Sequence, residues 1–558
     1  MQHQGPIAGI ATRGDLIATA GYDNKIILWD ARRRVALARA NHDHLVNHCS
    51  FSSNGRYLVS ASSDYSARVW EVPSLKLHTV LKGHDDDVDM AEFSPDDRHI
   101  ATCALDRCVR IYDLEGNCLH EMHGHTGNVL SLAWTRDGQH LVTSSVDGTI
   151  RKWDTQRGTE VQVTNLHVRT DSVEIGSDGA VYAGDDHGRI VLIEDERVHF
   201  VQAHRAGVKK VAVDARQGIL VSLSYDRSIA VWRIGGENRL QELSRSMLPA
   251  NIWARAATVL DDGRIATGTF GSTYAIFDPK TSTWDLEGVA AGTAINAVLN
   301  VNNRIYSVGD AGLVSIDGIP AAEMKSLCNF LVAIGDKVLT GGQLGLLFDA
   351  DTGTVLYEHH SPLNCAVAFR RNGIAHVAIG SYTGEILVFV LQPDGSLQMS
   401  VDLSVYENAV KGLSYSDGLL FSVCASTDIA WHRIADWTLA KRINKAHERI
   451  ANACCAVGDN QFATVSRDRT LRLWGANDNE IHDSPHPNSV KCIGVNTNRT
   501  TLLTGSYGGT LAMFDLVRKC WTAVSRPTGS GISSITWDDA RQRFLAASYD
   551  GNIYPVPA

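Results

Sequence analysis

The chain has 558 residues, of which 44% are hydrophobic and 20% are charged, and its net charge is −10. This acidic balance argues against nucleic-acid binding, which requires a basic surface. No window approaches the roughly 18 consecutive apolar residues of a transmembrane helix, and the first nine residues, MQHQGPIAG, lack the pattern of a signal peptide. The 11 cysteines show no C-x-x-C spacing. We therefore expect a reduced, cytoplasmic protein that binds neither nucleic acid nor membrane.

A histidine recurs along the chain at a nearly constant distance before an aspartate. The spacing is 22 residues in four cases, His42–Asp64, His84–Asp106, His125–Asp147 and His204–Asp226. It is 21 residues between His447 and Asp468, and His486 meets Gly508 where the aspartate is expected. Six residues after each of these positions stands an aromatic residue: Trp70, Tyr112, Trp153, Trp232, Trp474 or Phe514. Such a register indicates a structural repeat.

One complete unit spans residues 124–154, GHTGNVLSLAWTRDGQHLVTSSVDGTIRKWD. Its VLSLAW segment alternates apolar and polar residues, and DG pairs at 137–138 and 147–148 predict hairpin turns. The unit resembles the WD-repeat family, in which a blade opens with Gly-His and closes with Trp-Asp. The resemblance implies a four-stranded antiparallel sheet for each repeat, arranged radially in a β-propeller.

Each well-matched unit also carries a Ser or Thr between its His and Asp, and we expect these polar groups to form one buried hydrogen-bonded tetrad. A buried polar group is tolerated only when it is hydrogen-bonded, so the set is interpreted as framework and not as a hydrolase site. The expected tetrads are His42, Ser60, Asp64 and Trp70; His125, Thr143, Asp147 and Trp153; His204, Ser222, Asp226 and Trp232; and His447, Thr464, Asp468 and Trp474, with His84, Thr102 and Asp106 as the equivalent set that ends in Tyr112.

The repeat can be followed through 14 units, with a mean spacing of about 40 residues, the period of a propeller blade. Their closing residues are Trp29, Trp70, Tyr112, Trp153, Ile193, Trp232, Phe277, Ile316, Phe348, Phe389, Trp431, Trp474, Phe514 and Val556. The fold class is therefore expected to be all-β, with two seven-bladed propellers of four-stranded blades. In the simplest division, residues 1–288 form the first propeller and residues 289–558 form the second.

An interlocked arrangement is the alternative to this tandem one. The chain ends at the third strand of the last blade, and residues 1–5 are the only segment that precedes the first strand. If those residues supply the missing strand, blade 1 belongs to the second propeller. The sequence leaves both arrangements open.

No catalytic or cofactor motif is found in the sequence. The phosphate-binding loop, H-E-x-x-H and G-x-S-x-G patterns are all missing, so we expect no enzyme, no cofactor and no metal. The run Asp85, Asp86, Asp87 resembles a cation site but is interpreted as a solvated acidic rim. His44, His48 and His482 are interpreted in the same way as loop residues.

Aromatic residues recur at the position just before the framework aspartate, which in this family lies on the face that partners contact. They are Tyr22, Tyr225, Phe270, Tyr382, Tyr507 and Tyr549. Two interpretations stay open: the rings anchor a partner, or they pack into the mouth of the channel. The acidic run, Asp85 to Asp87, is the corresponding candidate for partner binding on the first propeller.

These observations predict a non-enzymatic scaffold or adaptor that holds one or more proteins on two rigid propellers. Arginine outnumbers lysine, which suggests a bacterial source, and there an ATPase or another enzyme of the same operon is a candidate partner. The alternative is a sensor that binds a small molecule or a peptide in a propeller channel. An enzyme is the less favoured third hypothesis.

Overall fold

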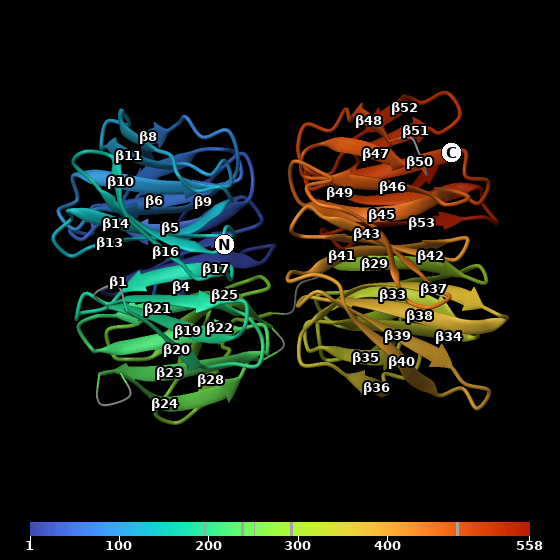
Figure 1. Cartoon of the computed structure of the whole chain (residues 1–558), viewed down its shortest axis with the longest axis horizontal. Helices are drawn as coiled ribbons and strands as arrows, with labels where there is room; N and C mark the ends of the chain where they lie inside the picture. Colours follow the sequence, from blue (N-terminus) through green and yellow to red (C-terminus); the bar gives the residue numbers. More distant parts are fainter. Residues whose placement is uncertain (195–196, 236–238, 250, 291–293, 476–478) are drawn as a thin grey trace. The chain divides into compact units, whose positions relative to one another are not determined.

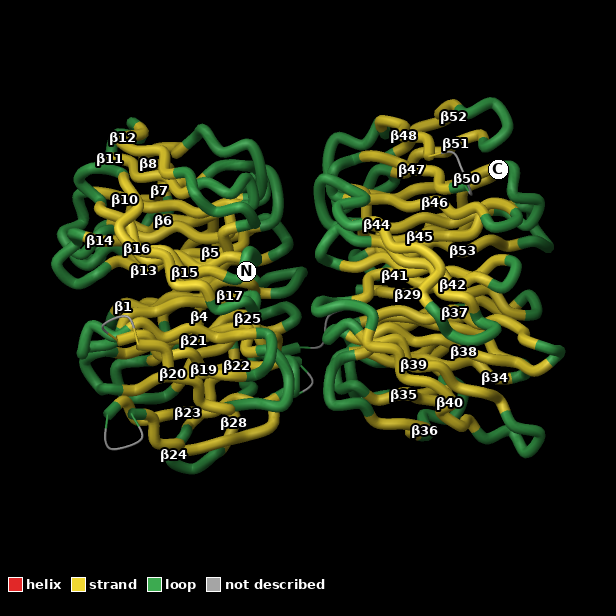
Figure 2. The backbone as a smooth tube through the Cα atoms, in the orientation of Figure 1, coloured by secondary structure: helices red, strands yellow, loops and turns green. Residues whose placement is uncertain are grey.

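The computed structural model describes residues 1–194, 197–235, 239–249, 251–290, 294–475 and 479–558 (Figure 1). Within these ranges every regular element is a β-strand, and strands and loops make up the trace (Figure 2). None of the described segments forms a helix that is long and apolar enough to cross a membrane. The described strands form 14 sheets, of which thirteen have four strands and one, β53–β55, has three. The predicted all-β fold of about 14 blades is confirmed.

The chain divides into two compact units, Met1–Ala291 and Gly292–Ala558, which contain β1–β28 and β29–β55. Within each unit the first strands of successive sheets lie side by side and form an inner ring. In the first unit these inner strands are β1 (Ile7–Arg13), β5 (Val46–Phe51), β9 (Val88–Phe93), β13 (Val129–Trp134), β17 (Thr170–Ile175), β21 (Val208–Asp214) and β25 (Ile252–Val259). In the second unit they are β29 (Ile295–Val301), β33 (Cys328–Ile334), β37 (Leu363–Arg371), β41 (Val410–Ser416), β45 (Ala451–Gly458), β49 (Val490–Val495) and β53 (Ile532–Asp538).

The inner ring of each unit is closed by strands of that unit. In the first, β1 packs beside β25, and a core cluster that contains Ile10 and Ala256 joins the first and seventh blades. In the second, β29 packs beside β53. His3 forms a backbone bridge with Ser272 of the seventh blade. The N-terminal segment therefore pairs within the first unit.

The hydrophobic core lies between neighbouring blades, and this position explains the sequence of each strand type. The second strand of a blade is covered on both faces, so β14 (His140–Ser145) is buried from its second residue to its last. The fourth strand is the outer edge, and β16 (Thr159–Asn165) contains no buried residue: five of its seven residues are exposed and two are half-buried. Trp153 belongs to the cluster between the third and fourth blades and is 1% exposed.

Glycine is required where a hairpin turn meets the loop that enters the next blade. Gly188 has a φ of 79°, and a Cβ there would lie 2.4 Å from the carbonyl oxygen of His204. A larger residue would have to displace backbone, so this turn needs glycine for space as well as for conformation. The His204 N–H also donates to the Gly188 carbonyl at 2.8 Å, which ties the entering loop to this turn.

Candidate functional site: the mouths of the two units

Hydrogen-bonded tetrads fix the loops at one end of each unit. In the fourth blade His125 Nδ1 lies 2.9 Å from Asp147, His125 Nε2 lies 2.8 Å from the Thr143 hydroxyl, and Trp153 Nε1 donates to that hydroxyl at 2.9 Å. Burial alone would raise the pKa of Asp147, but hydrogen bonds from His125 and Thr149 hold that pKa well below its usual range. The arrangement is a hydrogen-bonded polar network, which stabilises the loop.

The same geometry recurs in the other predicted sets. In each of the second, third and twelfth blades, the histidine contacts both its aspartate and its hydroxyl residue at 2.7–2.9 Å. In the sixth blade His204 Nδ1 lies 2.8 Å from Ser228, and Asp226 is more distant at 3.4 Å. In the third blade the Tyr112 hydroxyl donates to the Lys82 carbonyl at 3.0 Å.

A complete tetrad in the first blade was missed by the sequence analysis. His3 contacts Asp23 at 2.9 Å and Thr19 at 2.8 Å, and Trp29 Nε1 donates to Thr19 at 2.8 Å. Against the effect of burial, the bonds to His3 lower the pKa of Asp23 to about 2. The spacing of Asp23 and Trp29 was a usable signal, but His3 follows no glycine and lies only 20 residues before Asp23.

The thirteenth blade has an incomplete tetrad. His486 Nε2 lies 2.8 Å from Thr504, but Gly508 provides no carboxylate. His486 Nδ1 is buried and has no hydrogen-bond partner among the described residues. Burial lowers the pKa of His486 to about 4, because nothing in the blade compensates the charged form.

The end of each inner ring at which its strands begin is called the mouth of that unit. The second residue of an inner strand is polar in most of the blades, and asparagine occupies this position five times. Each of these asparagines donates its side-chain amide to the carbonyl of the first residue of the next inner strand: Asn47 to Val88, Asn296 to Cys328, Asn329 to Leu363, Asn364 to Val410 and Asn452 to Val490. Ser533 bonds to Ile295 in the same way and closes the second ring. We call these contacts the latches.

Lysine occupies the latch position three times, as Lys209 in the first unit and as Lys411 and Lys491 in the second. In the first unit Lys209 lies 2.5 Å from Asp171 and also forms an ion pair with Asp186, while Arg169 pairs with Asp171 at 2.7 Å. The Lys209 side chain is 5% exposed and lies 4.8 Å from the centroid of the Tyr225 ring. This cation is thus neutralised by carboxylates of its own unit.

In the second unit the latch position of the thirteenth blade is Lys491. This half-buried lysine lies 5.8 Å from the centroid of the Tyr507 ring and forms no ion pair with any residue the structure describes. Tyr507 and Tyr549 raise the pKa of Lys491 above its usual value in spite of burial. Arg467 lies 5.8 Å from the same Tyr507 ring. A charged lysine beside an aromatic ring and without a carboxylate partner among the described residues is a group that attracts an anion.

The predicted aromatic residues lie at the mouths and are less accessible than binding anchors were expected to be. Tyr225 is 6% exposed, and the other five are half-buried. In the first unit Tyr22 packs edge-on against Trp253 with ring centroids 5.1 Å apart, and Trp253 continues to Phe270 at 6.2 Å. In the second unit Lys411 Nζ lies 5.9 Å from the centroid of the Tyr382 ring. The rings therefore pack into the mouths, and their contact with a partner stays a prediction.

The acidic run of the first unit enters the third blade. Asp85 is exposed, Asp86 is half-buried, and Asp87 is 6% exposed. Its backbone is tied to the framework, since Asp85 donates its N–H to Asp106 at 3.2 Å. Asp85 and Asp86 are the members of the run that a partner could reach.

Comparison with known proteins agrees with this architecture. The model of the family "WD domain, G-beta repeat" matches residues 1–30, 37–71, 75–113 and 116–154, which cover the first four blades. The telomerase protein component 1 of Rattus norvegicus is 26% identical over 299 residues, 47% of this chain and 11% of that protein. WD repeat-containing protein 55 of Pongo abelii is 25% identical over 183 residues, 32% of this chain and 48% of that protein.

A component of chromatin assembly factor 1 from Gallus gallus is 25% identical over 159 residues, 27% of this chain and 25% of that protein. The chain thus spans less than half the length of each of these three relatives. The family model, the relatives and the recurring tetrads identify the same repeat. Residues 1–154 thus match the WD-repeat family, and the sheets that follow repeat the same antiparallel architecture.

Proposed function

We propose that this protein is a non-enzymatic interaction scaffold, and that the mouth of its second unit binds an acidic segment of a partner protein. The observation that carries the proposal is Lys491, which lies 5.8 Å from the centroid of the Tyr507 ring and forms no ion pair with any described residue. A fixed, partly desolvated ammonium group with aromatic walls suits a carboxylate. Little conformational freedom is lost on binding, because the latches already hold the strands of the mouth.

The contrast with the first unit supports this assignment. Lys209 occupies the same repeat position but is neutralised by Asp171 and Asp186. A lysine at this position can therefore be paired within its own unit, whereas Lys491 forms no ion pair with a residue that the structure describes. The accessible Asp85 and Asp86 give the first unit an acidic surface, which favours a different, basic partner. The names of two similar proteins, a telomerase component and a component of an assembly factor, also suit a role in a larger assembly.

The test is a binding titration with labelled oligoglutamate and oligolysine peptides of equal length. We expect the wild-type chain to bind oligoglutamate in a salt-dependent way, and Lys491→Met to weaken that binding at least about tenfold. Lys441→Met is the matched control, because Lys441 also lies over an aromatic ring, 5.1 Å from Trp431, but on an outer strand.

Affinity purification from the native host, with the same three proteins as bait, extends the test to the true partner. A stoichiometric protein retained by wild type and Lys441→Met, and lost from Lys491→Met, would support the scaffold. A small anionic metabolite that competes with oligoglutamate and raises the melting temperature would favour the sensor alternative. Equal oligoglutamate binding by wild type and Lys491→Met would show that the mouth is not the site.

A further inference from the structure

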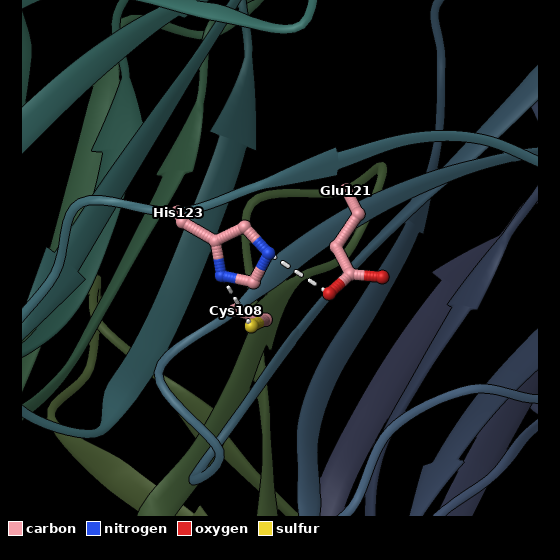
Figure 3. A group of neighbouring side chains, drawn as sticks. All are labelled: Cys108, Glu121 and His123. Carbon is pink, nitrogen blue, oxygen red and sulfur yellow. Dashed lines mark hydrogen bonds and ion pairs between the residues drawn. The ribbon is translucent and has the colours of Figure 1, made fainter.

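The side chains of Cys108, Arg110, Glu121 and His123 lie close together on one face of the third blade. Strands β11 (Val109–Asp113) and β12 (Cys118–Met122) pair with Val109 opposite Met122 and Arg110 opposite Glu121. The next pair along the register is Cys108 and His123. Because side chains alternate across a strand, Cys108 and Arg110 face the same side as His123 and Glu121. The register thus brings together a thiol, an imidazole and a carboxylate that are scattered in the sequence (Figure 3).

The three groups are in direct contact. Cys108 Sγ lies 3.1 Å from His123 Nδ1, and His123 Nε2 lies 2.9 Å from Glu121 Oε1. Ligand atoms from all three residues lie within 4.8 Å of one another. The side chains of His123 and Glu121 are 64% and 45% exposed, whereas Cys108 is 7% exposed. The cluster is therefore open to solvent on one side, with the thiol at its base.

A nucleophilic thiol is one chemistry that this chain of contacts suggests, and two observations argue against it. A nucleophile acts as the thiolate, but burial, together with the charge of Asp106, raises the pKa of Cys108 to about 11. The 7% exposure of Cys108 also leaves a substrate little access to the sulfur atom. The accessible groups of the cluster are the imidazole and the carboxylate.

The donor atoms of the cluster are better suited to binding a metal ion than to nucleophilic catalysis. Thiolate, imidazole and carboxylate together are typical ligands of zinc and of other late divalent transition metals, whereas calcium and magnesium prefer oxygen ligands alone. Bonds of about 2.0–2.3 Å to one zinc ion place its ligand atoms roughly 3.3–3.8 Å apart. Cys108 Sγ and His123 Nδ1, 3.1 Å apart, lie close to that range. Glu121 now contacts the opposite nitrogen, Nε2, at 2.9 Å, and its exposed side chain would turn toward the ion on binding.

We propose that Cys108, Glu121 and His123 bind one divalent transition-metal ion, for which zinc is the best match. When the metal–sulfur bond forms, the thiol loses its proton to solvent, and the fourth position of a tetrahedral site is left for water. Arg110, 3.1 Å from Glu121 and 2.9 Å from the framework residue Asp106, would hold the carboxylate from the other side. The bound ion would thereby connect the outer strand of the third blade to its tetrad.

The experiment is a cobalt titration of the reduced full-length protein, followed by displacement with zinc. Cobalt bound to a thiolate gives a charge-transfer absorption band in the near ultraviolet, which a site without sulfur lacks. We expect the band to saturate at one equivalent of cobalt and to disappear when zinc is added. Cys108→Ser should abolish the band, and His123→Asn and Glu121→Gln should each weaken cobalt binding at least about tenfold.

Cys118→Ser is the matched control, because Cys118 is an exposed thiol of the same strand pair and lies outside the cluster. It should keep the band. The proposal is overturned if wild type shows no band, if Cys108→Ser keeps it, or if Cys118→Ser loses it. Loss of folding would not explain a negative result with His123→Asn, since that side chain is largely exposed. Unchanged cobalt binding by that variant would also overturn the proposal.

Discussion

At the scale of single residues, the incomplete tetrad of the thirteenth blade makes stability depend on pH. His486 has a pKa of about 4 in the folded protein, compared with about 6.5 for an ordinary histidine. As the pH falls below about 6.5, His486 becomes protonated in the unfolded chain but stays neutral in the folded protein. The free energy of unfolding therefore falls with pH, by on the order of 3 kcal/mol once the pH reaches about 4.

A carboxylate at position 508 should reduce this loss. Gly508→Asp restores the residue found in the complete tetrads, and Asn488→Gly makes room for it, because a Cβ at position 508 would lie 2.4 Å from the Asn488 side chain. We expect the double variant to lose less stability than wild type between about pH 7 and about pH 5, measured by urea unfolding. Asn488→Gly alone is the control and should behave as wild type does. An equal loss in the double variant would refute the assignment to His486.

The extent to which single residues could be predicted depends on whether their chemistry repeats. The tetrads of His42, His125 and His447 were predicted because each histidine stands in register with a hydroxyl residue, an aspartate and a tryptophan. Lys491 could not be singled out in this way, because a single lysine near the start of a strand is common. Only its surroundings in the folded protein distinguish it. The contact of Cys108 with His123 was also out of reach, because it depends on the register of two strands.

At the scale of strands, the latches connect each blade to the next through the backbone of the inner ring. Asn329 donates to the Leu363 carbonyl at 2.8 Å, so Asn329→Asp would replace a donor with a negatively charged acceptor. We expect the substitution to lower the free energy of unfolding by about 2 kcal/mol, measured by urea titration. Asn498→Asp makes the same chemical change in an exposed turn of the same unit and should have little effect. Equal stability of the two variants would mean that the latch contributes nothing.

The strands themselves could be predicted because their burial follows their place in the blade. Alternation in VLSLAW and the paired DG turns predicted β13 and the hairpins beside it. The latch could also have been found, since Asn47, Asn296 and Asn329 each follow the apolar or cysteine residue that begins an inner strand. The exposure of the aromatic residues could not be predicted from the sequence, because neighbouring blades determine how deeply a ring is buried in the mouth. Trp253, which packs between Tyr22 and Phe270, illustrates that dependence.

At the scale of the whole chain, each unit contains the contacts that close its own inner ring. The first is closed by β1 beside β25 and by the bridge from His3 to Ser272, and the second by β29 beside β53 and the Ser533 latch to Ile295. A closed ring buries the faces of all its blades against one another, so it needs no strand from elsewhere. We therefore expect two separately expressed polypeptides, 1–290 and 294–558, each to fold.

Circular dichroism and thermal unfolding of the two polypeptides, alone and mixed, would check this expectation. Each alone should show a β-sheet spectrum and a cooperative transition, and mixing should leave both transitions in place. Interlocked propellers would behave differently, because removal of the first blade from its ring would leave an open inner strand on each side. A polypeptide that unfolds cooperatively only in the presence of the other would then show that the units depend on one another. Independent folding would instead mean that one partner-binding mouth can be altered without loss of the other, which is the property a two-partner scaffold requires.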